Sequence, residues 1–126
     1  MCKQLQKGDT VSYGRHYTSD GTGYILTIPL GYADGFFRKN TGKEVYVENE
    51  YGTIVGSVCM DQLMILCEHH HPDGAKVELF GEHIDVNERA KQLGTISYEL
   101  YTSLSDRLTR KYVRNGKIFM SIDPRF

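Results

Sequence analysis

The sequence has no strong excess or block of charge of one sign. Its 126 residues include 15 basic and 16 acidic side chains, which gives a net charge of −1 at pH 7. Proteins that bind nucleic acids or anionic membranes usually concentrate basic residues in a patch or a tail. We therefore expect neither nucleic acid nor membrane among the partners of this chain.

Long apolar runs and paired cysteines are also missing. The longest mostly apolar stretch, residues 24–30, is far shorter than the roughly 20 residues that cross a bilayer, and the amino terminus lacks the apolar core of a signal peptide. Three cysteines cannot all pair with one another, and Cys2, Cys59 and Cys67 form no C-x-x-C motif. These absences predict a soluble, cytoplasmic protein with free thiols.

Sequence motifs for bound ions and nucleotides are weak or absent. The only histidine cluster is His69-His70-His71, and adjacent strand residues point to opposite faces, so one strand cannot aim three of them at one ion. We interpret this cluster as a polar turn leading into Pro72 and expect no metal site. No glycine-rich phosphate-binding loop of the nucleotide-binding types is present.

The remaining pattern is typical of an all-β domain. Thirteen glycines punctuate short runs of β-branched and aromatic residues, and 40% apolar content is enough for one core. Strands are predicted at residues 10–13, 24–30, 45–47, 53–58, 63–67 and 76–80. Reversals are predicted at residues 50–52 and 71–74, and Asn115-Gly116 predicts a type I′ hairpin because both positions tolerate positive φ. The sequence thus predicts a mainly β fold, a closed or partly open β-barrel.

Two short helices are predicted near the carboxy-terminal third. Asp85 can cap a helix of about two turns with Glu88 reaching back, and Gly94 can end it in the left-handed region. Thr95 can cap a second helix, in which apolar residues recurring every four positions make one stripe: Ile96, Leu100 and Leu104.

Four blocks of sequence carry a family resemblance. They are VSYGR at 11–15, TIPLGYADG at 27–35, VGSVCMDQ at 55–62 and GTISYE at 94–99. In order and spacing they resemble the carboxy-terminal β-domain of alanine racemases, fold-type III enzymes that use pyridoxal 5'-phosphate. The resemblance covers residues 8 to about 112 and implies one such domain over residues 1–126.

The family's layout implies partners that this chain lacks. In alanine racemases an amino-terminal (β/α)8 barrel, absent from this chain, binds pyridoxal phosphate through a lysine. The β-domain of one subunit of a homodimer faces the cofactor of the other. The resemblance therefore implies interconversion of L-alanine and D-alanine for peptidoglycan precursor supply, with the isolated domain inactive. We also expect that the chain is an excised fragment whose exposed docking surface makes it self-associate.

Tyr13 is the predicted catalytic residue. By resemblance it matches the tyrosine that acts as acid and base on the face of the substrate α-carbon opposite the lysine. Inverting a stereocentre through a planar carbanion requires a proton to leave from one side and return on the other. Because an ordinary tyrosine pKa is about 10, such a base needs nearby positive charge, and Arg15 shares a strand face with Tyr13.

Five other residues match binding positions of the family. The main-chain amide of Met60 matches the group that binds the substrate carboxylate, and Asp61 matches an aspartate of the substrate channel. Tyr32 matches a tyrosine at the inner gate, and Arg38 an arginine at the outer entrance, where a cation attracts a carboxylate. Tyr98 matches the tyrosine that reaches the cofactor phosphate and narrows the pocket, which favours alanine over serine.

One departure from the family pattern leaves alternatives open. Ser57 stands where most alanine racemases have an arginine, so a cation of the channel is missing. A serine/alanine racemase, or another enzyme of this cofactor fold such as an amino-acid decarboxylase, stays possible as an alternative. A freestanding β-barrel module that binds a ligand without catalysis is the non-enzyme alternative.

Overall fold

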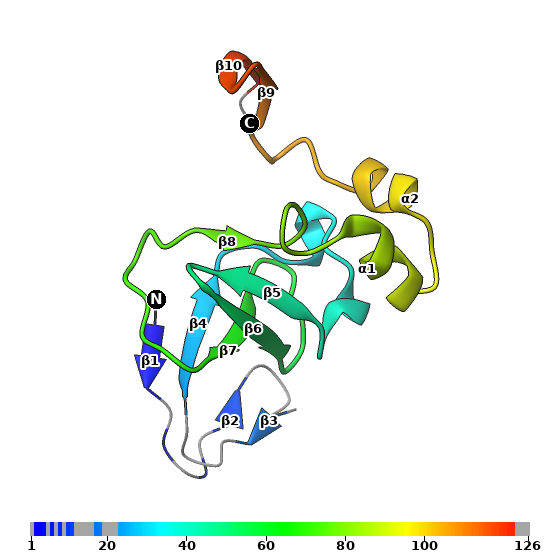
Figure 1. Cartoon of the computed structure of the whole chain (residues 1–126). Helices are drawn as coiled ribbons and strands as arrows, with labels where there is room; N and C mark the ends of the chain where they lie inside the picture. Colours follow the sequence, from blue (N-terminus) through cyan, green and yellow to red (C-terminus); the bar gives the residue numbers. More distant parts are fainter. Residues whose placement is uncertain are drawn as a thin grey trace.

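The computed structural model describes residues 2–4, 6, 8, 10–11, 17–18 and 23–122. Its main feature is a six-stranded sheet in which every neighbouring pair is antiparallel. The sheet curls into a half-barrel, with the two short helices beside it (Figure 1). This confirms the predicted mainly β fold and its partly open barrel. In spatial order the strands are β1 (Cys2–Gln4), β4 (Tyr24–Ile28), β7 (Leu63–Cys67), β6 (Glu50–Val55), β5 (Glu44–Val47) and β8 (Val77–Glu78).

The central strands form the core through alternating burial. In β7, Leu63, Ile65 and Cys67 are buried while the residues between them are partly exposed, as the period of two in a strand requires. Val45 and Val47 of β5 alternate in the same way and are fully buried. The predicted strand at 63–67 is confirmed residue for residue. Two others are shorter than predicted, ending at Ile28 and spanning only Val77–Glu78. The strand predicted at residues 53–58 lies three residues earlier, at Glu50–Val55.

The turn between β5 and β6 lies two residues before its predicted place. The sequence predicted a reversal at residues 50–52, whereas Val47 pairs with Glu50 and the chain reverses at Glu48 and Asn49, both with positive φ. The prediction was wrong because Gly52 looked like a turn glycine. Gly52 instead lies inside β6, where a Cβ would press on the Ile65 side chain of β7.

Both predicted helices form, the first with the predicted Asp85 cap and the second with another cap and apolar face than predicted. In α1 (Val86–Gln92) the Asp85 side chain accepts hydrogen bonds from two main-chain amides of the first turn, and Gly94 has φ of 75°. In α2 (Ser97–Thr102) the N-cap is Ile96, without a side-chain cap, so the predicted Thr95 cap is wrong. The predicted apolar stripe is also wrong, because only Leu100 is buried and Ile96 is 63% exposed.

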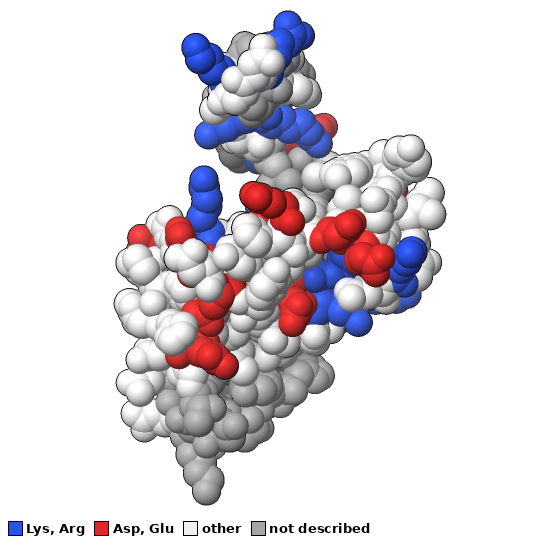
Figure 2. All heavy atoms as spheres, in the orientation of Figure 1, with Lys and Arg blue, Asp and Glu red and all other residues white. Residues whose placement is uncertain are grey.

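A separate hairpin projects from the body of the molecule (Figure 1). It consists of β9 (Arg110–Arg114) and β10 (Lys117–Ile122), joined through Asn115 and Gly116 with φ of 52° and 76°, which confirms the predicted turn. Figure 2 shows basic side chains on this hairpin and mostly acidic ones across the visible face of the body. A third, two-stranded sheet pairs β2 (Thr10–Val11) with β3 (Tyr17–Thr18). No helix in the described part of the chain could span a bilayer.

Candidate active-site loops

Two loops that contain predicted site residues are joined by main-chain hydrogen bonds. We call them the 31–35 loop, which includes the short 3-10 helix η1 (Tyr32–Asp34), and the 56–62 loop. The amide of Tyr32 donates to the carbonyl of Cys59 and that of Ala33 to the carbonyl of Met60, both at 3.0 Å. A Cβ on Gly31 would overlap these same two carbonyl oxygens, so only glycine permits this approach.

A buried carboxylate and an arginine fix the pair of loops to the segment that follows α2. Asp34 is 5% exposed, and its Oδ2 accepts from the main-chain amide of Gly31 at 3.1 Å. Arg107 lies between two carboxylates, with its Nε 3.5 Å from Asp34 Oδ1 and its Nη2 3.3 Å from Asp61 Oδ1. The carbonyl of Asp34 also accepts from the amide of Ser105 at 3.0 Å. Arg107 thus links both loops through their acidic residues.

The 56–62 loop contains a main-chain amide, that of Met60, which no residue in the described part of the chain uses. Its carbonyl is used by Ala33, but no described residue accepts a hydrogen bond from its N–H. Met60 as a whole residue is 52% exposed. Cys59 is half-buried, and its thiol donates to the carbonyl of Ser57 at 3.6 Å. This exposed loop therefore contains a main-chain donor that is not used within the described part of the chain.

Tyr32 and Arg38 lie against each other at the mouth of a hollow. The guanidinium carbon of Arg38 lies 5.9 Å from the centre of the Tyr32 ring, within the range of a cation–π contact. Both residues line a cavity of about 430 Å³ together with Thr95 and Glu99. The two predicted channel residues are therefore neighbours, and each is well exposed.

A buried arginine holds the segment that carries Arg38. That segment forms the 3-10 helix η2 (Arg38–Asn40), and Arg89 of α1 reaches it by donating from Nη1 to Asn40 Oδ1 at 2.9 Å. The same guanidinium donates from Nη2 to the carbonyl of Glu44 in β5 and from Nε to Gln92. Burial lowers the pKa of Arg89, with the Glu44 charge opposing that change. The interior position of Arg89 thus connects α1, β5 and η2.

Within the described part of the chain, Tyr98 makes no hydrogen bond to these loops. Tyr98 lies on α2 and is 75% exposed, and its hydroxyl has no hydrogen-bond partner within the described part of the chain. Tyr13, the predicted acid/base, and its neighbour Arg15 lie outside the described residues. Of the six predicted site residues, the structure brings together Tyr32 with Arg38 and Met60, and it places Asp61 on the Met60 loop.

Sequence reasoning missed Arg107 and the role of Asp34. Asp34 stands three residues after Gly31, the spacing at which a carboxylate can accept from the first amide of a turn, so its role had a local signal. Arg107 had none, because it is 46 residues from Asp61 in sequence and nothing nearby marks it.

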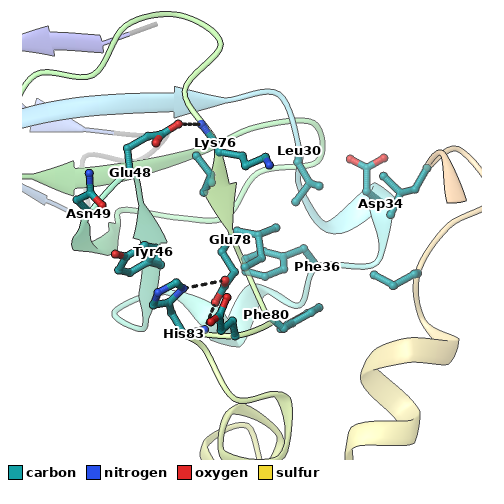
Figure 3. Close-up of a pocket in the computed structure, with 15 residues that line it drawn as sticks. Leu30, Asp34, Phe36, Tyr46, Glu48, Asn49, Lys76, Glu78, Phe80 and His83 are labelled. Carbon is teal, nitrogen blue, oxygen red and sulfur yellow. Dashed lines mark hydrogen bonds and ion pairs between the residues drawn. The ribbon is translucent and has the colours of Figure 1, made fainter. Parts of the chain in front are cut away.

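A second, larger hollow lies elsewhere on the molecule (Figure 3). It has a volume of about 780 Å³ and shares only Asp34 with the two loops. In it the rings of Tyr46 and His83 stack at 3.6 Å, and the Glu78 carboxylate accepts from the main-chain amides of His83 and Ile84. Burial would raise the pKa of Glu78, but its hydrogen bonds to the His83 side chain and to those amides outweigh this and lower it. None of the predicted site residues that the structure describes lines this hollow.

Comparison with known proteins decides the family. A sequence model of the family described as "Alanine racemase, C-terminal domain" matches residues 1–112. The chain belongs to the alanine racemase C-terminal domain family. Alanine racemase 1 of Bacillus subtilis is 40% identical over 126 residues, which cover 97% of this chain and 32% of that protein. This C-terminal domain therefore spans about a third of the length of the curated relatives it matches.

Solved structures agree with the fold of the C-terminal domain. The alanine racemase of Bacillus anthracis with bound L-Ala-P superimposes with a TM-score of 0.93 at 42% identity, over 98% of this chain and 33% of that one. The histidine racemase of Leuconostoc mesenteroides superimposes with a TM-score of 0.75 at 33% identity, over 83% of this chain and 30% of that one. Racemases named for different amino acids thus share this domain.

Proposed function

We propose that this C-terminal domain serves an alanine racemase that depends on pyridoxal phosphate, and that it closes the active site of a partner subunit in a homodimer. The observation that carries the proposal is the pair of hydrogen-bonded loops that contain Tyr32 and Met60, both of which are exposed. The domain that bears these loops is about one third the length of its relative. The large apolar residues exposed on the described part of this domain include Tyr32, Met60, Ile96, Tyr98 and Tyr101, besides Tyr51, Tyr112, Ile118 and Met120. Exposure on this scale favours a surface that other protein covers.

The first role proposed for the domain is to hold the substrate carboxylate. No described residue accepts a hydrogen bond from the main-chain amide of Met60, and the carbonyls of Cys59 and Met60, on either side of that amide, are held by hydrogen bonds from the 31–35 loop. A donor held in this way loses little entropy when an anion docks. Arg38, packed over Tyr32, adds positive charge along the approach.

The second role is to move a proton at the substrate α-carbon. Tyr13 supplies the hydroxyl that gives a proton to one face of the carbon or removes it, and the barrel lysine serves the opposite face. Two faces are required because racemisation returns the proton on the side opposite its departure. One base alone would return the starting enantiomer.

The cofactor would be held mainly by the barrel, with one contact from this domain. When bound, pyridoxal phosphate supplies the electron sink that makes the α-proton acidic. The Tyr98 hydroxyl fits a phosphate oxygen chemically, because it is an exposed donor with no partner in the described part of the chain. Tyr98 therefore binds and orients, and it does not transfer the proton.

One of the matched structures is named for a racemase of another amino acid. The C-terminal domain of a protein named histidine racemase has the same fold, so the domain alone does not fix the side chain accepted. Alanine is favoured because Tyr98 narrows the pocket, as the family resemblance implies. Serine and histidine are the substrates to compare with it.

The test joins this chain to the remaining, amino-terminal part of the Bacillus subtilis relative. We expect the chimaera to interconvert L-alanine and D-alanine, and the amino-terminal part alone to be inactive. Met60→Pro removes the main-chain N–H, and the matched variant Met60→Ala keeps it. We expect Met60→Pro to raise KM for alanine about tenfold or more and Met60→Ala to change it little. Equal KM values for the two variants would contradict the carboxylate role.

A further inference from the structure

A cluster of metal-ligating side chains lies at the opposite end of β7 from the active-site loops. Glu50 begins β6, Cys67 ends β7, and His71 lies in the loop that follows. The ligating atoms of these three side chains all lie within 4.8 Å of one another, and His71 Nε2 is 2.6 Å from Glu50 Oε2. Cys67 is 2% exposed and His71 is 5% exposed. A carboxylate, a thiol and an imidazole thus converge in a nearly buried place.

The cluster is held in position by its surroundings. The Glu50 carboxylate accepts from the main-chain amides of Glu68 at 2.7 Å and His69 at 3.2 Å, which fixes the loop against β6. The main-chain amide of His71 donates to Cys2 Sγ at 3.5 Å. Supporting contacts of this kind orient the ligands of known metal sites.

The position of His71 differs from the interpretation of the histidine run as a polar turn. His69 and His70 are exposed, as that interpretation predicts, and the turn at Asp73-Gly74 is present. His71 alone turns inward, because its ring reaches Glu50 across the end of the sheet. One histidine joins residues from two strands, an arrangement that local sequence could not indicate.

We propose that Glu50 Oε2, Cys67 Sγ and His71 Nε2 bind one divalent transition metal ion of the zinc class, with water as the fourth ligand. Sulfur, imidazole nitrogen and carboxylate oxygen bind zinc at about 2.3, 2.0 and 2.1 Å, so in a tetrahedron their atoms lie roughly 3.3 to 3.8 Å apart. The observed separations, from 2.6 Å between His71 Nε2 and Glu50 Oε2 to at most 4.8 Å, bracket these values. Zinc suits this donor set, whereas calcium and magnesium require oxygen ligands.

Binding requires the thiol to lose its proton. In the metal-free protein, burial and the charges of Glu50 and Cys2 raise the pKa of Cys67 to about 12, so the thiol is neutral. A cation beside the sulfur reverses this balance, and the thiol proton leaves to solvent as the metal–sulfur bond forms. His71 coordinates as neutral imidazole with its proton on Nδ1.

The role of this site is structural. The ion would tie the start of β6, the end of β7 and the following loop together at one point. Cys67 lies four residues along β7 from Leu63, about 14 Å from the end that joins the 56–62 loop. Loss of the ion should therefore lower the thermal stability of this chain, while the KM of the chimaera for alanine stays unchanged. This proposal can thus fail without the proposed function failing.

The experiment uses the untagged chain, stripped of metal and kept reduced, with Co²⁺ as a coloured substitute for zinc. We expect a thiolate-to-cobalt charge-transfer band in the near ultraviolet that saturates at one equivalent and disappears on adding Zn²⁺. Cys67→Ser should abolish this band, whereas the matched variants Cys2→Ser and Cys59→Ser should keep it. Absence of a saturable band, or its survival in Cys67→Ser, would overturn the proposal.

A second pair of variants tests the proposal independently, in case Cys67→Ser does not fold. His71→Gln should weaken Zn²⁺ binding about tenfold or more, while His70→Gln, at the exposed neighbour, should leave it unchanged. Zn²⁺ should raise the thermal midpoint of the original chain and of His70→Gln, but not that of His71→Gln. Equal zinc affinities for the two histidine variants would show that the cluster is only a hydrogen-bonded clamp.

Discussion

Replacement of Gly31 by alanine tests the contact between the two active-site loops. The added Cβ would overlap the main-chain oxygens of Cys59 and Met60, which cannot rotate away as a flexible side chain could. Gly31 has φ of −155°, so the backbone conformation itself suits alanine and only the lack of space opposes it. The loops must separate to relieve the overlap.

The cost follows from the contacts that separation breaks. The hydrogen bonds from the amides of Tyr32 and Ala33 are each worth about 0.5–1.5 kcal/mol, and overpacking costs about 1–3 kcal/mol. We expect Gly31→Ala to lower the free energy of unfolding by about 2–6 kcal/mol. Because the chain contains no tryptophan, urea unfolding is best followed by circular dichroism, where the midpoint should fall by about 1 M or more.

Gly42→Ala is the matched control for this experiment. A Cβ on Gly42 meets no atom within 4 Å, but its φ of +84° is unfavourable for alanine. We expect a loss of about 1 kcal/mol from this backbone strain alone. If Gly31→Ala were no more destabilising than Gly42→Ala, the close approach of the loops would be refuted, and with it the fixed position of the Met60 amide.

Three further predictions concern stability and assembly. Arg89→Ala should lower the free energy of unfolding in urea by about 2–5 kcal/mol, because buried acceptors lose their donor. Lys91→Ala, on the exposed face of α1, should lower it by less than about 0.5 kcal/mol. Similar losses for the two variants would contradict the buried hydrogen-bond network of Arg89. Because the pKa of Glu78 is lowered in the folded state, the ionised carboxylate stabilises the fold above its ordinary pKa of 4.5, and this stabilisation is lost as the pH falls through the lower pKa of the folded state. Glu78→Gln should therefore make the thermal midpoint fall less steeply at acid pH. An unchanged fall would contradict the stabilising role of the Glu78 carboxylate. Since Tyr98 and other large apolar side chains are exposed, the isolated chain should self-associate in light scattering at high concentration, and a monodisperse monomer would argue against a covered surface.

Local signals in the sequence predicted the elements that local chemistry determines. Asp85, Gly94 and Asn115-Gly116 act within a few residues of themselves, and the structure confirms each of them. The strand at residues 63–67 was predictable because a short, continuous apolar run is typical of a buried strand. The curled sheet followed from the number and spacing of such strands.

The errors arose where distant residues decide local structure. Gly52 lies inside a strand, and it is a glycine because Ile65 of the neighbouring strand leaves no room for a side chain. No residue near Gly52 in the sequence indicates this contact. Ile96 is exposed although its spacing from Leu100 suits an apolar stripe, because the helix begins only at Ser97. The link from Arg107 to Asp34 and Asp61, and the cluster at Cys67, depend on sheet register, which the sequence does not state.

The most direct test of the account is the fate of the substrate α-proton in the chimaera when Tyr13 is replaced by phenylalanine. With alanine deuterated at the α-carbon, we expect Tyr13→Phe to abolish net racemisation and to stop exchange into solvent from one enantiomer, while exchange from the other continues. Tyr46→Phe, whose ring stacks on His83 in the other hollow, should leave both exchanges unchanged. Wild-type exchange from both enantiomers in Tyr13→Phe would contradict the claim that this domain supplies one of the two bases.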